Sequence, residues 1–388
     1  MTPAARHAAA IEVLDLVLQG TPVERALTQW GRTHRFAGSG DRTAIRDHVY
    51  DVWRARRSLA VLGGGETGRA LILGLLRREG IAPETVFGAG GHAPAALHPE
   101  ETATPIRTPT PAEAADLPDW LWPVWQTSLG DVATAAALVQ QARADLHLRV
   151  NLSRSTREAA AARLREEGIE TVPHPEVATG LVVTTHARRV AASTALSEGL
   201  VEVQDAASQL AVAALPLAPG LRVLDYCAGG GGKALAIADR IAGPVWAHDI
   251  DAGRMGDIAP RAARAGARIE IVAPGTAARL DPFDLVFVDA PCSGSGTWRR
   301  TPEAKWHLTP NRLEELNRMQ DEVLDCAAAL CSPGGKLAYA TCSVLTSENE
   351  DRVAAFLDRS PGWTMESGLT LIPSAGHDGF FLTVLGRA

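Results

Sequence analysis

The chain has 388 residues, of which 46% are hydrophobic and 21% are charged, with 9 Trp and a formal net charge of −7. This composition excludes disordered and fibrous proteins and predicts a globular protein of two or three domains. The negative net charge does not by itself indicate a nucleic-acid-binding protein, because phosphate contacts require clusters of Lys and Arg.

The start of the chain does not have the pattern of a targeting segment. Glu12 and Asp15 lie among its apolar residues, which argues against a signal peptide or a transit peptide. No uninterrupted apolar run reaches the roughly 18 residues that a membrane-spanning helix needs. Five cysteines without a secretion signal favour reduced thiols over disulfides. We expect a cytoplasmic, monomeric protein with no membrane partner.

Residues 1–90 are predicted to form a small helical domain, because apolar residues recur at helical spacing, as in Ile11, Leu14 and Val17. The stretch 21–60 is locally basic, with eight arginines against four acids. Two interpretations stay open, namely a contact with RNA and a solvated helical face that carries Asp–Arg pairs. The arginines are Arg25, Arg32, Arg35, Arg42, Arg46, Arg54, Arg56 and Arg57.

Residues 91–118 are rich in Pro, Thr, Ala and Glu and show no periodicity, which predicts a linker. Residues 119–200 combine a predicted helix over 156–167 with short apolar runs at 146–150 and 181–183. This pattern indicates a small α+β module.

Residues 201–388 are predicted to form a Rossmann-like α/β domain. Short apolar strands alternate there with helical stretches, which indicates a doubly wound and mostly parallel sheet. The predicted strands cover residues 222–225, 245–249, 269–272, 285–289, 337–340 and 380–385.

The run LRVLDYCAGGGGKALAIADRI reads as a strand, a glycine-rich turn and a helix. Glycines let the backbone approach a ligand, and the first turn of the helix offers free N–H groups. Asp249 follows Asp225 at a spacing close to that of the acid that meets the ribose of an adenosine cofactor. Ala234 after Lys233 excludes a phosphate-binding loop of the Gly-Lys-Ser/Thr type. The alternative that these glycines serve only close packing stays open.

Two cysteines follow strands of the predicted sheet, Cys292 in VDAPCSGSG and Cys342 in ATCSV. Ligands of open α/β sheets bind beyond the carboxyl ends of the strands, so both loops are expected to face one pocket. A single buried cysteine is more often a small apolar core residue, but a pair so placed favours chemistry. Cys326 and Cys331, placed on a predicted helix without a nearby histidine ligand, indicate core packing and no metal site.

A pair of cysteines suits the methylation of a pyrimidine ring. Carbon-5 of cytosine is a poor nucleophile until a thiolate adds at carbon-6 and converts the ring into an enamine. Asp289, just before the first cysteine loop, could hydrogen-bond the base and offset charge that develops on the ring. The predicted activity is therefore methyl transfer from S-adenosylmethionine to carbon-5 of a cytosine.

These motifs resemble those of the Sun-type (Fmu-like, NusB-fused) bacterial ribosomal RNA cytosine-5 methyltransferases. The resemblance rests on VEVQDAASQL, DYCAGGGGKAL, AHDIDAGRM, FVDAPCSGSGTWRRTPEAKW, GGKLAYATCSVLTSENE and HDGFF. It implies that Cys342 attacks the base, that Cys292 assists product release and that Asp289 contacts the cytosine. It also implies that S-adenosylmethionine is held by Cys227, Ala228, Gly229, Gly230, Gly231, Gly232, Lys233, Asp249, Arg254 and Asp289.

The N-terminal run ALTQWGRTHRFAGSGDRTAIRDHVYDVWRARRSL resembles the NusB-like RNA-binding domain that is often fused to this enzyme. The resemblance implies an RNA partner, with 16S ribosomal RNA as the implied substrate. Two departures from the family pattern stand out. Gly229 and Gly230 replace Ala-Pro, with Ala234 in place of Thr, which is expected to loosen the turn. IVAPGTAARL also lacks the acid that reads the adenine amine in many members.

Three other functions were weighed against this one. A non-catalytic RNA-binding or ribosome-assembly protein is suggested by the altered glycine turn, and a transfer RNA cytosine-5 methyltransferase also fits the motifs. A small-molecule methyltransferase is disfavoured, because paired cysteines have no evident use in oxygen or nitrogen methylation.

Overall fold

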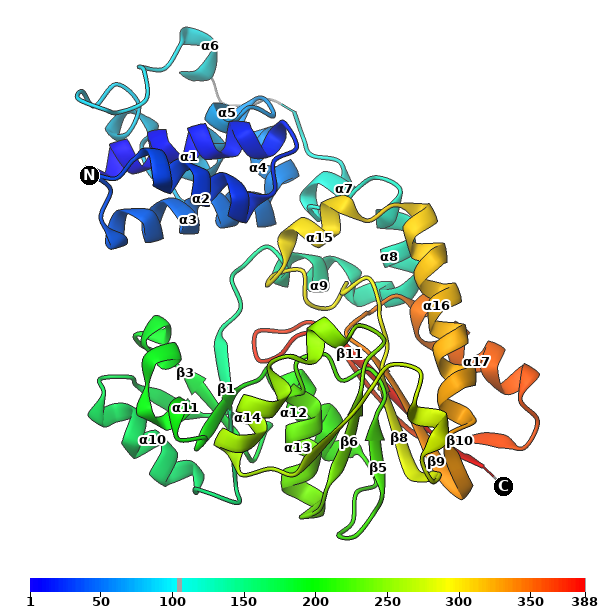
Figure 1. Ribbon diagram of the computed structural model, residues 1–388. Coiled ribbons are helices and arrows are strands. Elements are labelled where there is room, and N and C mark those ends of the chain that lie inside the picture. The colour runs from blue at the N-terminus through cyan, green and yellow to red at the C-terminus, as the bar shows by residue number, and fades with distance from the viewer. Residues whose placement is uncertain (103–106, 388) are drawn as a thin grey trace. The chain divides into compact units, whose positions relative to one another are not determined.

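The computed structural model describes residues 1–102 and 107–387, which form two compact units (Figure 1). The first unit comprises Met1–Arg143 and Trp298–His307, and the second comprises Ala144–Thr297 and Leu308–Ala388. Each has its own hydrophobic core.

The described part of the first unit is all-helical, as the sequence predicted for the N-terminal region. Its core includes Leu14, Val49, Leu59 and Leu71, all completely buried. Pro3 stands in the first turn of the first helix, and the hydroxyl of Thr2 accepts a hydrogen bond there. The helices are α1 (Pro3–Leu18), α2 (Val23–Thr33), α3 (Ser39–Arg54), α4 (Arg56–Gly63), α5 (Gly68–Arg78), α6 (Pro99–Thr102), α7 (Pro111–Ala114), α8 (Leu121–Leu129), α9 (Ala133–Val139) and α15 (Pro302–His307).

A short segment, 298–307, belongs to the helical unit although the chain on both sides of it belongs to the other unit. The Lys305 Nζ donates a hydrogen bond to the Arg54 carbonyl at 3.1 Å, and Trp298 stacks on Trp125 with ring centroids 5.8 Å apart. Burial lowers the pKa of Lys305 to about 8. No periodicity in the sequence indicated this insertion.

The second unit contains a four-stranded antiparallel sheet of order β2-β3-β1-β4. The predicted helix at 156–167 is α10 (Arg157–Glu166), which the Thr156 side chain caps. The predicted runs at 146–150 and 181–183 are strands of this sheet. The strands are β1 (Leu146–Val150), β2 (Thr171–Pro173), β3 (Gly180–Val183) and β4 (Val201–Val203), and α11 (Thr194–Ser197) lies among them in the chain.

The second sheet of this unit has seven strands in the order β10-β11-β9-β8-β5-β6-β7. The five strands from β9 to β7 are parallel, whereas β11 and β10 are antiparallel. The predicted doubly wound, mostly parallel sheet is therefore confirmed. The strands are β5 (Val223–Asp225), β6 (Val245–His248), β7 (Ile269–Val272), β8 (Phe283–Asp289), β9 (Cys331–Thr341), β10 (Trp363–Leu371) and β11 (Phe380–Arg387).

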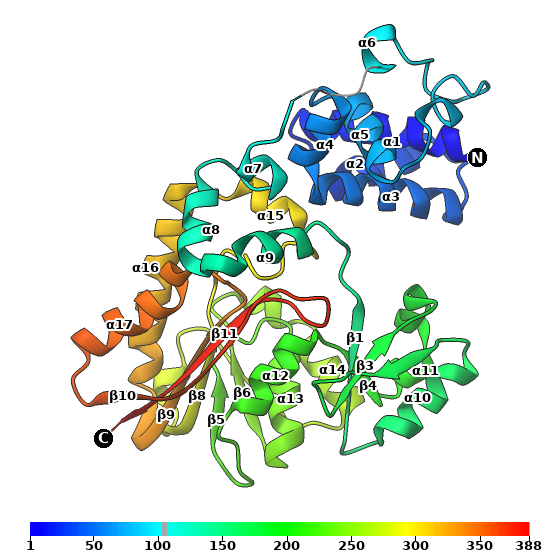
Figure 2. The same ribbon diagram turned by 180° about the vertical axis from the view of Figure 1, so that it is seen from behind.

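Helices cover both faces of this sheet (Figure 2). One face packs α12 and α13 against β11 and β6, and the other packs α16 against β8 and β9. Alternate strand residues point to the two cores, with Phe287 in the first and Val288 in the second. The helices are α12 (Ala206–Ala214), α13 (Gly232–Ile241), α14 (Ile258–Ala265), α16 (Pro310–Ala328) and α17 (Glu350–Arg359).

Four sequence predictions differ from the structure in detail. Strand β10 was not predicted, because it is an edge strand whose residues 364–368 are exposed and lack an apolar run. The prediction that Cys331 lies on a helix is wrong, since α16 ends at Ala328 and Cys331 begins β9. Core packing is confirmed for the buried Cys331 and is wrong for Cys326, which is exposed on α16. The predicted linker 91–118 contains α6 and α7 among its described residues, and residues 103–106 lie outside the described part.

The boundaries of the two compact units differ from those of the predicted domains. Residues 119–143 belong to the helical unit, because Arg57 donates hydrogen bonds to the Leu117 carbonyl and to Asp119 at 2.6 and 2.7 Å. The two sheets share one unit. The division into domains at residues 90, 118 and 200 stays a prediction.

Across residues 1–102 and 107–387, no single helix is long and apolar enough to cross a membrane. The pair α4 and α5, bent by 90°, meets these two criteria only when taken together.

Candidate active site

The two cysteine loops predicted from the sequence meet at the carboxyl ends of neighbouring parallel strands. Asp289 at the end of β8 pairs with Ala340 near the end of β9. Cys292 follows β8 and Cys342 follows β9, and their Sγ atoms lie 3.5 Å apart. Two thiols separated by 50 residues in the chain are therefore in direct contact.

The two thiols are not equivalent. A hydrogen bond with Cys342 and burial raise the pKa of Cys292 well above its usual value. Cys292 therefore keeps its proton at neutral pH and can donate it toward the other sulfur. The 3.5 Å contact allows either sulfur to donate, and a protonated Cys292 would donate to Cys342.

Lys233 and Asp289 form an ion pair beside the thiols, with the Lys233 Nζ 2.6 Å from the Asp289 Oδ2. Burial lowers the pKa of Lys233, but the charge and hydrogen bond of Asp289 outweigh this effect, so the pKa of Lys233 is raised. The ammonium therefore stays charged. It also lies 5.3 Å from the centre of the Phe380 ring. Lys233, predicted for the cofactor loop, is thus shared with the cysteine end of the site.

A buried glutamate holds both cysteine loops. Glu348 is fully buried and accepts hydrogen bonds from the backbone N–H of Ser293 at 2.8 Å and from the Ser343 hydroxyl at 2.5 Å. The Ser293 hydroxyl also donates to it. Because Ser293 directly follows Cys292 and Ser343 directly follows Cys342, one carboxylate fixes both loops.

Further buried hydrogen bonds complete this Glu348 network. The Gln320 side chain on α16 donates to the Pro291 carbonyl at 2.9 Å and to Glu348 at 3.1 Å. The hydroxyls of Ser295 and Ser343 lie 2.8 Å apart, which joins the two loops directly. Sequence reasoning missed Glu348, although its position six residues after Cys342, in SENE, was a signal.

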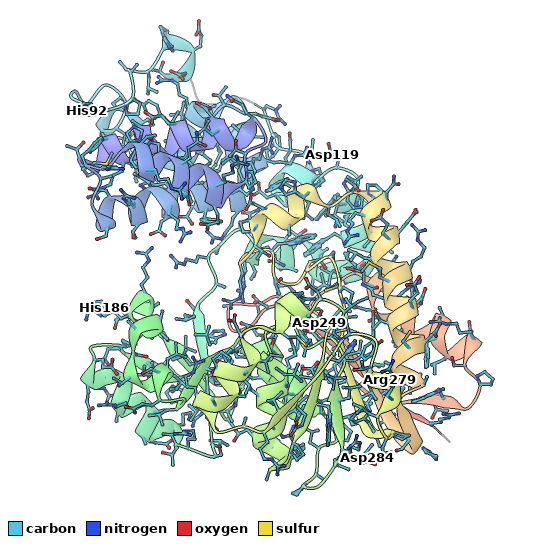
Figure 3. All side chains as sticks on the ribbon, in the orientation of Figure 1. His92, Asp119, His186, Asp249, Arg279 and Asp284 are labelled. Carbon is cyan, nitrogen blue, oxygen red and sulfur yellow. The ribbon has the colours of Figure 1, made fainter. Side chains whose placement is uncertain are left out.

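The glycine-rich turn leads into α13, as predicted. Gly231 has φ +79°, and a Cβ there would lie 2.9 Å from Ile258. Both the conformation and the space therefore require glycine. Gly229 has φ +49°, and its N–H donates to the Asp249 Oδ2 at 2.9 Å. Figure 3 labels Asp249, which follows β6.

Two arginines brace this turn. Arg254 lies 3.2 Å from the Asp249 carboxylate. Arg261 on α14 donates to the Gly230 carbonyl and forms an ion pair with Glu202 at 3.1 Å. Arg254 was predicted and Arg261 was not. The positions beside Gly229 and Gly230 are thus filled by guanidinium groups from the following segment, whereas the predicted loosening of the turn stays a prediction.

Asp225 lies among the charges of Asp289, Lys233 and Asp249. It is 1% exposed, its Oδ1 has no hydrogen-bond partner in the described part of the chain, and burial together with the charges of Asp289 and Asp249 raises its pKa to about 7. Lys233 pairs with Asp289 and Arg254 pairs with Asp249, so the buried Asp225 acceptor is left to a ligand that donates a hydrogen bond or carries positive charge. A sulfonium cofactor with an ammonium group has that character.

The remaining predicted residues of the loop have backbone roles in the structure. The Ala228 N–H donates to the His248 carbonyl at 2.8 Å, which joins the turn to β6. Burial and the carboxylates nearby raise the pKa of Cys227, so its sulfur is unreactive. No acidic residue occurs between β7 and residue 280, as the sequence indicated. In residues 1–102 and 107–387, no three His, Cys, Asp or Glu side chains are grouped to hold a metal ion.

Comparison with known proteins places the chain in a family. A family model described as 16S rRNA methyltransferase RsmB/F matches residues 212–384, and one described as the ferredoxin-like domain of RsmF/B-like methyltransferases matches residues 117–190. A ribosomal RNA small subunit methyltransferase B from Xanthomonas campestris is 34% identical over 300 residues, which cover 72% of this chain and 68% of the relative. The chain belongs to the 16S rRNA methyltransferase RsmB/F family.

Another curated relative of this RsmB/F family member, the ribosomal RNA small subunit methyltransferase B of Cronobacter sakazakii, is 34% identical over 69% of this chain and 66% of its own length. The matches cover 60 to 66% of the length of the first three relatives found. A solved methyltransferase homolog protein from Pyrococcus horikoshii has a TM-score of 0.63 at 21% identity, over 73% of this chain and 100% of that one. This likeness shows a shared fold.

Proposed function

We propose that this protein transfers a methyl group from S-adenosylmethionine to carbon-5 of a cytosine in 16S ribosomal RNA, with Cys342 as the nucleophile. The observation that carries the proposal is the contact of the Cys292 and Cys342 sulfur atoms, 3.5 Å apart, at neighbouring strand ends. Membership of the RsmB/F family supports RNA as the substrate.

The residues that would hold the cofactor are the turn from Cys227 to Lys233, together with Asp249 and Arg254. When bound, S-adenosylmethionine supplies an electrophilic methyl group on a positively charged sulfur. The N–H groups at the start of α13 and the unpartnered Asp225 oxygen match its polar and cationic parts.

The protein's own groups activate the base. The Cys342 thiolate forms a bond to carbon-6, and the electrons of the carbon-5–carbon-6 double bond make carbon-5 nucleophilic. Asp289 can accept a hydrogen bond from the exocyclic amine of the cytosine. The Lys233 ammonium, fixed by Asp289, offsets negative charge that develops on the ring.

Cys292 is suited to the last step, in which the carbon-5 proton leaves. The hydrogen bond to Cys342 is the main cause of the high pKa of Cys292. Once Cys342 is bonded to carbon, that cause is removed and the pKa of Cys292 falls, while burial and the charges of Glu348 and Asp289 still raise it. We propose that the Cys292 proton leaves to solvent at this stage. The Cys292 thiolate then accepts the carbon-5 proton, the ring double bond re-forms, and the bond to the Cys342 sulfur breaks.

Replacement of each cysteine tests these roles separately. Cys342→Ala should lower methyl transfer to RNA by on the order of a thousandfold or more, because no other group can add to carbon-6. Cys292→Ala should leave a covalent protein–RNA adduct that a denaturing gel resolves. Cys326→Ala, which removes an exposed thiol on α16, is the matched control and should behave like the unaltered protein. Full turnover by Cys342→Ala would exclude it as the nucleophile.

Two further measurements address the alternative functions. Calorimetric titration with S-adenosylmethionine should show binding, and its absence at millimolar cofactor would favour a non-catalytic RNA-binding protein. Bisulfite sequencing of 16S ribosomal RNA and of transfer RNA, from cells with and without this protein, should locate the modified cytosine. A site found only in transfer RNA would overturn the proposed substrate.

A further inference from the structure

The helical unit contains an open cavity of about 540 Å³, away from the residues described above. Small residues of α1 line it, at Ala5, Ala8 and Ala9. Gly90, Gly91 and His92 also line it, and Figure 3 labels His92 in that loop. The volume falls within the range of pockets that hold small molecules of drug size.

Aromatic rings also line the cavity. Trp30 and His34 are stacked, with ring centroids 4.3 Å apart at an angle of 9°. Phe36 meets His34 edge to face at 5.8 Å, and 74% of its surface is exposed. Because most of its surface is exposed and it lines the cavity, the Phe36 ring is accessible to a ligand there.

The carboxylate of Glu12 lines the same cavity. The Glu12 side chain accepts a hydrogen bond from the Trp30 indole N–H at 2.8 Å and is itself 59% exposed. The cavity therefore offers planar aromatic surface together with an acceptor for N–H groups. Nucleobases with an exocyclic amine carry both complementary features.

The arginines of the basic stretch divide into two groups. Several are held by acids, as in the pairs Arg46–Glu24, Arg54–Asp51 and Arg56–Glu66. Arg25, Arg32 and Arg35 are exposed and form no ion pair with residues in the described part of the chain. Arg35 is adjacent in sequence to His34 and Phe36, which line the cavity, so its backbone lies next to these two residues. This arrangement suits the phosphate next to a stacked base better than an apolar protein segment.

We propose that this cavity binds an unpaired nucleotide of the RNA, with the base stacked on the rings of His34 and Phe36 and held by Glu12. The proposal rests on the proposed function, since it takes RNA as the substrate. It gives the helical unit a specific part in RNA recognition, namely the capture of a single-stranded base that carries an amino group.

The test measures the affinity of the full chain for single-stranded oligoadenylate and for 16S ribosomal RNA, by fluorescence anisotropy and filter binding. Phe36→Ala should weaken both by roughly 5- to 150-fold, the range for loss of one base–aromatic stack. Leu138→Ala is the matched control, since Leu138 is a 51% exposed apolar residue of the same unit outside the cavity, and it should leave the affinities unchanged. Equal affinities of Phe36→Ala and the unaltered chain would overturn the proposal.

A second variant keeps the test independent of folding and of catalysis. Glu12→Gln should reduce the preference for oligoadenylate over oligouridylate while the melting temperature stays within about 2 °C, because Glu12 is exposed. Binding that depends on Phe36 without any methyl transfer would reject the proposed function and support this inference. If methyl transfer is observed and Phe36→Ala leaves RNA binding unchanged, the inference alone is rejected. If a peptide competes for the cavity and nucleotides do not, the cavity binds a protein partner and the inference is rejected.

Discussion

The cysteine end and the cofactor end of the site are held in place by different kinds of interaction, although both lie at the carboxyl ends of strands of the same parallel sheet. The two cysteine loops are held by buried hydrogen bonds that converge on Glu348. The glycine-rich turn is held by Asp249 and by the guanidinium groups of Arg254 and Arg261, whose side chains are partly exposed.

This difference follows from what each end has to do. The proposed covalent chemistry requires the two sulfur atoms and the cytosine ring to keep fixed positions relative to one another. Buried hydrogen bonds hold the cysteine loops in such positions. Cofactor binding requires that a ligand enter and leave. A turn braced by partly exposed arginines can adjust at lower free-energy cost than a buried network.

The largest effect should come from the Glu348 network. Glu348→Ala leaves the Ser293 and Ser343 groups without their acceptor, so kcat should fall by about 100-fold while the affinity for S-adenosylmethionine stays within about twofold. Stopped assays and calorimetry measure these two quantities. Glu348→Gln, which keeps an acceptor oxygen, should recover part of the rate, and Glu350→Ala, which removes an exposed acid nearby, should do nothing. A parallel loss of cofactor affinity would show that the two ends are not separate.

The next largest effect should come from the glycine turn. Gly231→Ala combines a positive φ with a contact at 2.9 Å to Ile258, and this strain should weaken cofactor binding by about 10- to 100-fold. Gly220→Ala is the control, because Gly220 has φ +87° but open space around its Cβ. If both variants bind the cofactor equally well, the turn does not shape that site.

Asp225 should make cofactor binding dependent on pH. Its pKa is raised to about 7, so the folded protein keeps this carboxyl protonated where the unfolded chain, with a pKa near 4, does not. The resulting stability is complete below about pH 4 and is lost as the pH rises through 7. A cationic ligand favours the carboxylate, so cofactor affinity should rise by up to about tenfold from pH 6 to pH 8. Calorimetry on Asp225→Asn should show a flat profile.

The smallest effect should come from Arg254. This guanidinium is 57% exposed and its pair with Asp249 is open to solvent on one side. Arg254→Gln should therefore change the dissociation constant of S-adenosylmethionine by less than about fivefold, as expected for an exposed ion pair. A loss above a hundredfold would show that Arg254 contributes more to cofactor binding than an exposed contact can.

The sequence alone determined the α/β class of the second unit, the positions of six strands of its large sheet and the meeting of Cys292 and Cys342. These features depend on local periodicity and on the rule that parallel strands place their carboxyl ends at one edge. Strand β10 and the insertion of 298–307 into the helical unit depend instead on packing partners far away in the chain.

Only the tertiary structure decided how the site is held. The roles of Glu348 and Arg261, the sharing of Lys233 between the two ends and the aromatic cavity beside Glu12 all arise from side chains that are distant in sequence. Local patterns record the preferences of neighbouring residues, whereas hydrogen bonds and ion pairs across loops depend on the assembled backbone. The residues that meet at the candidate site could therefore be predicted from motifs, but the groups that orient them could not.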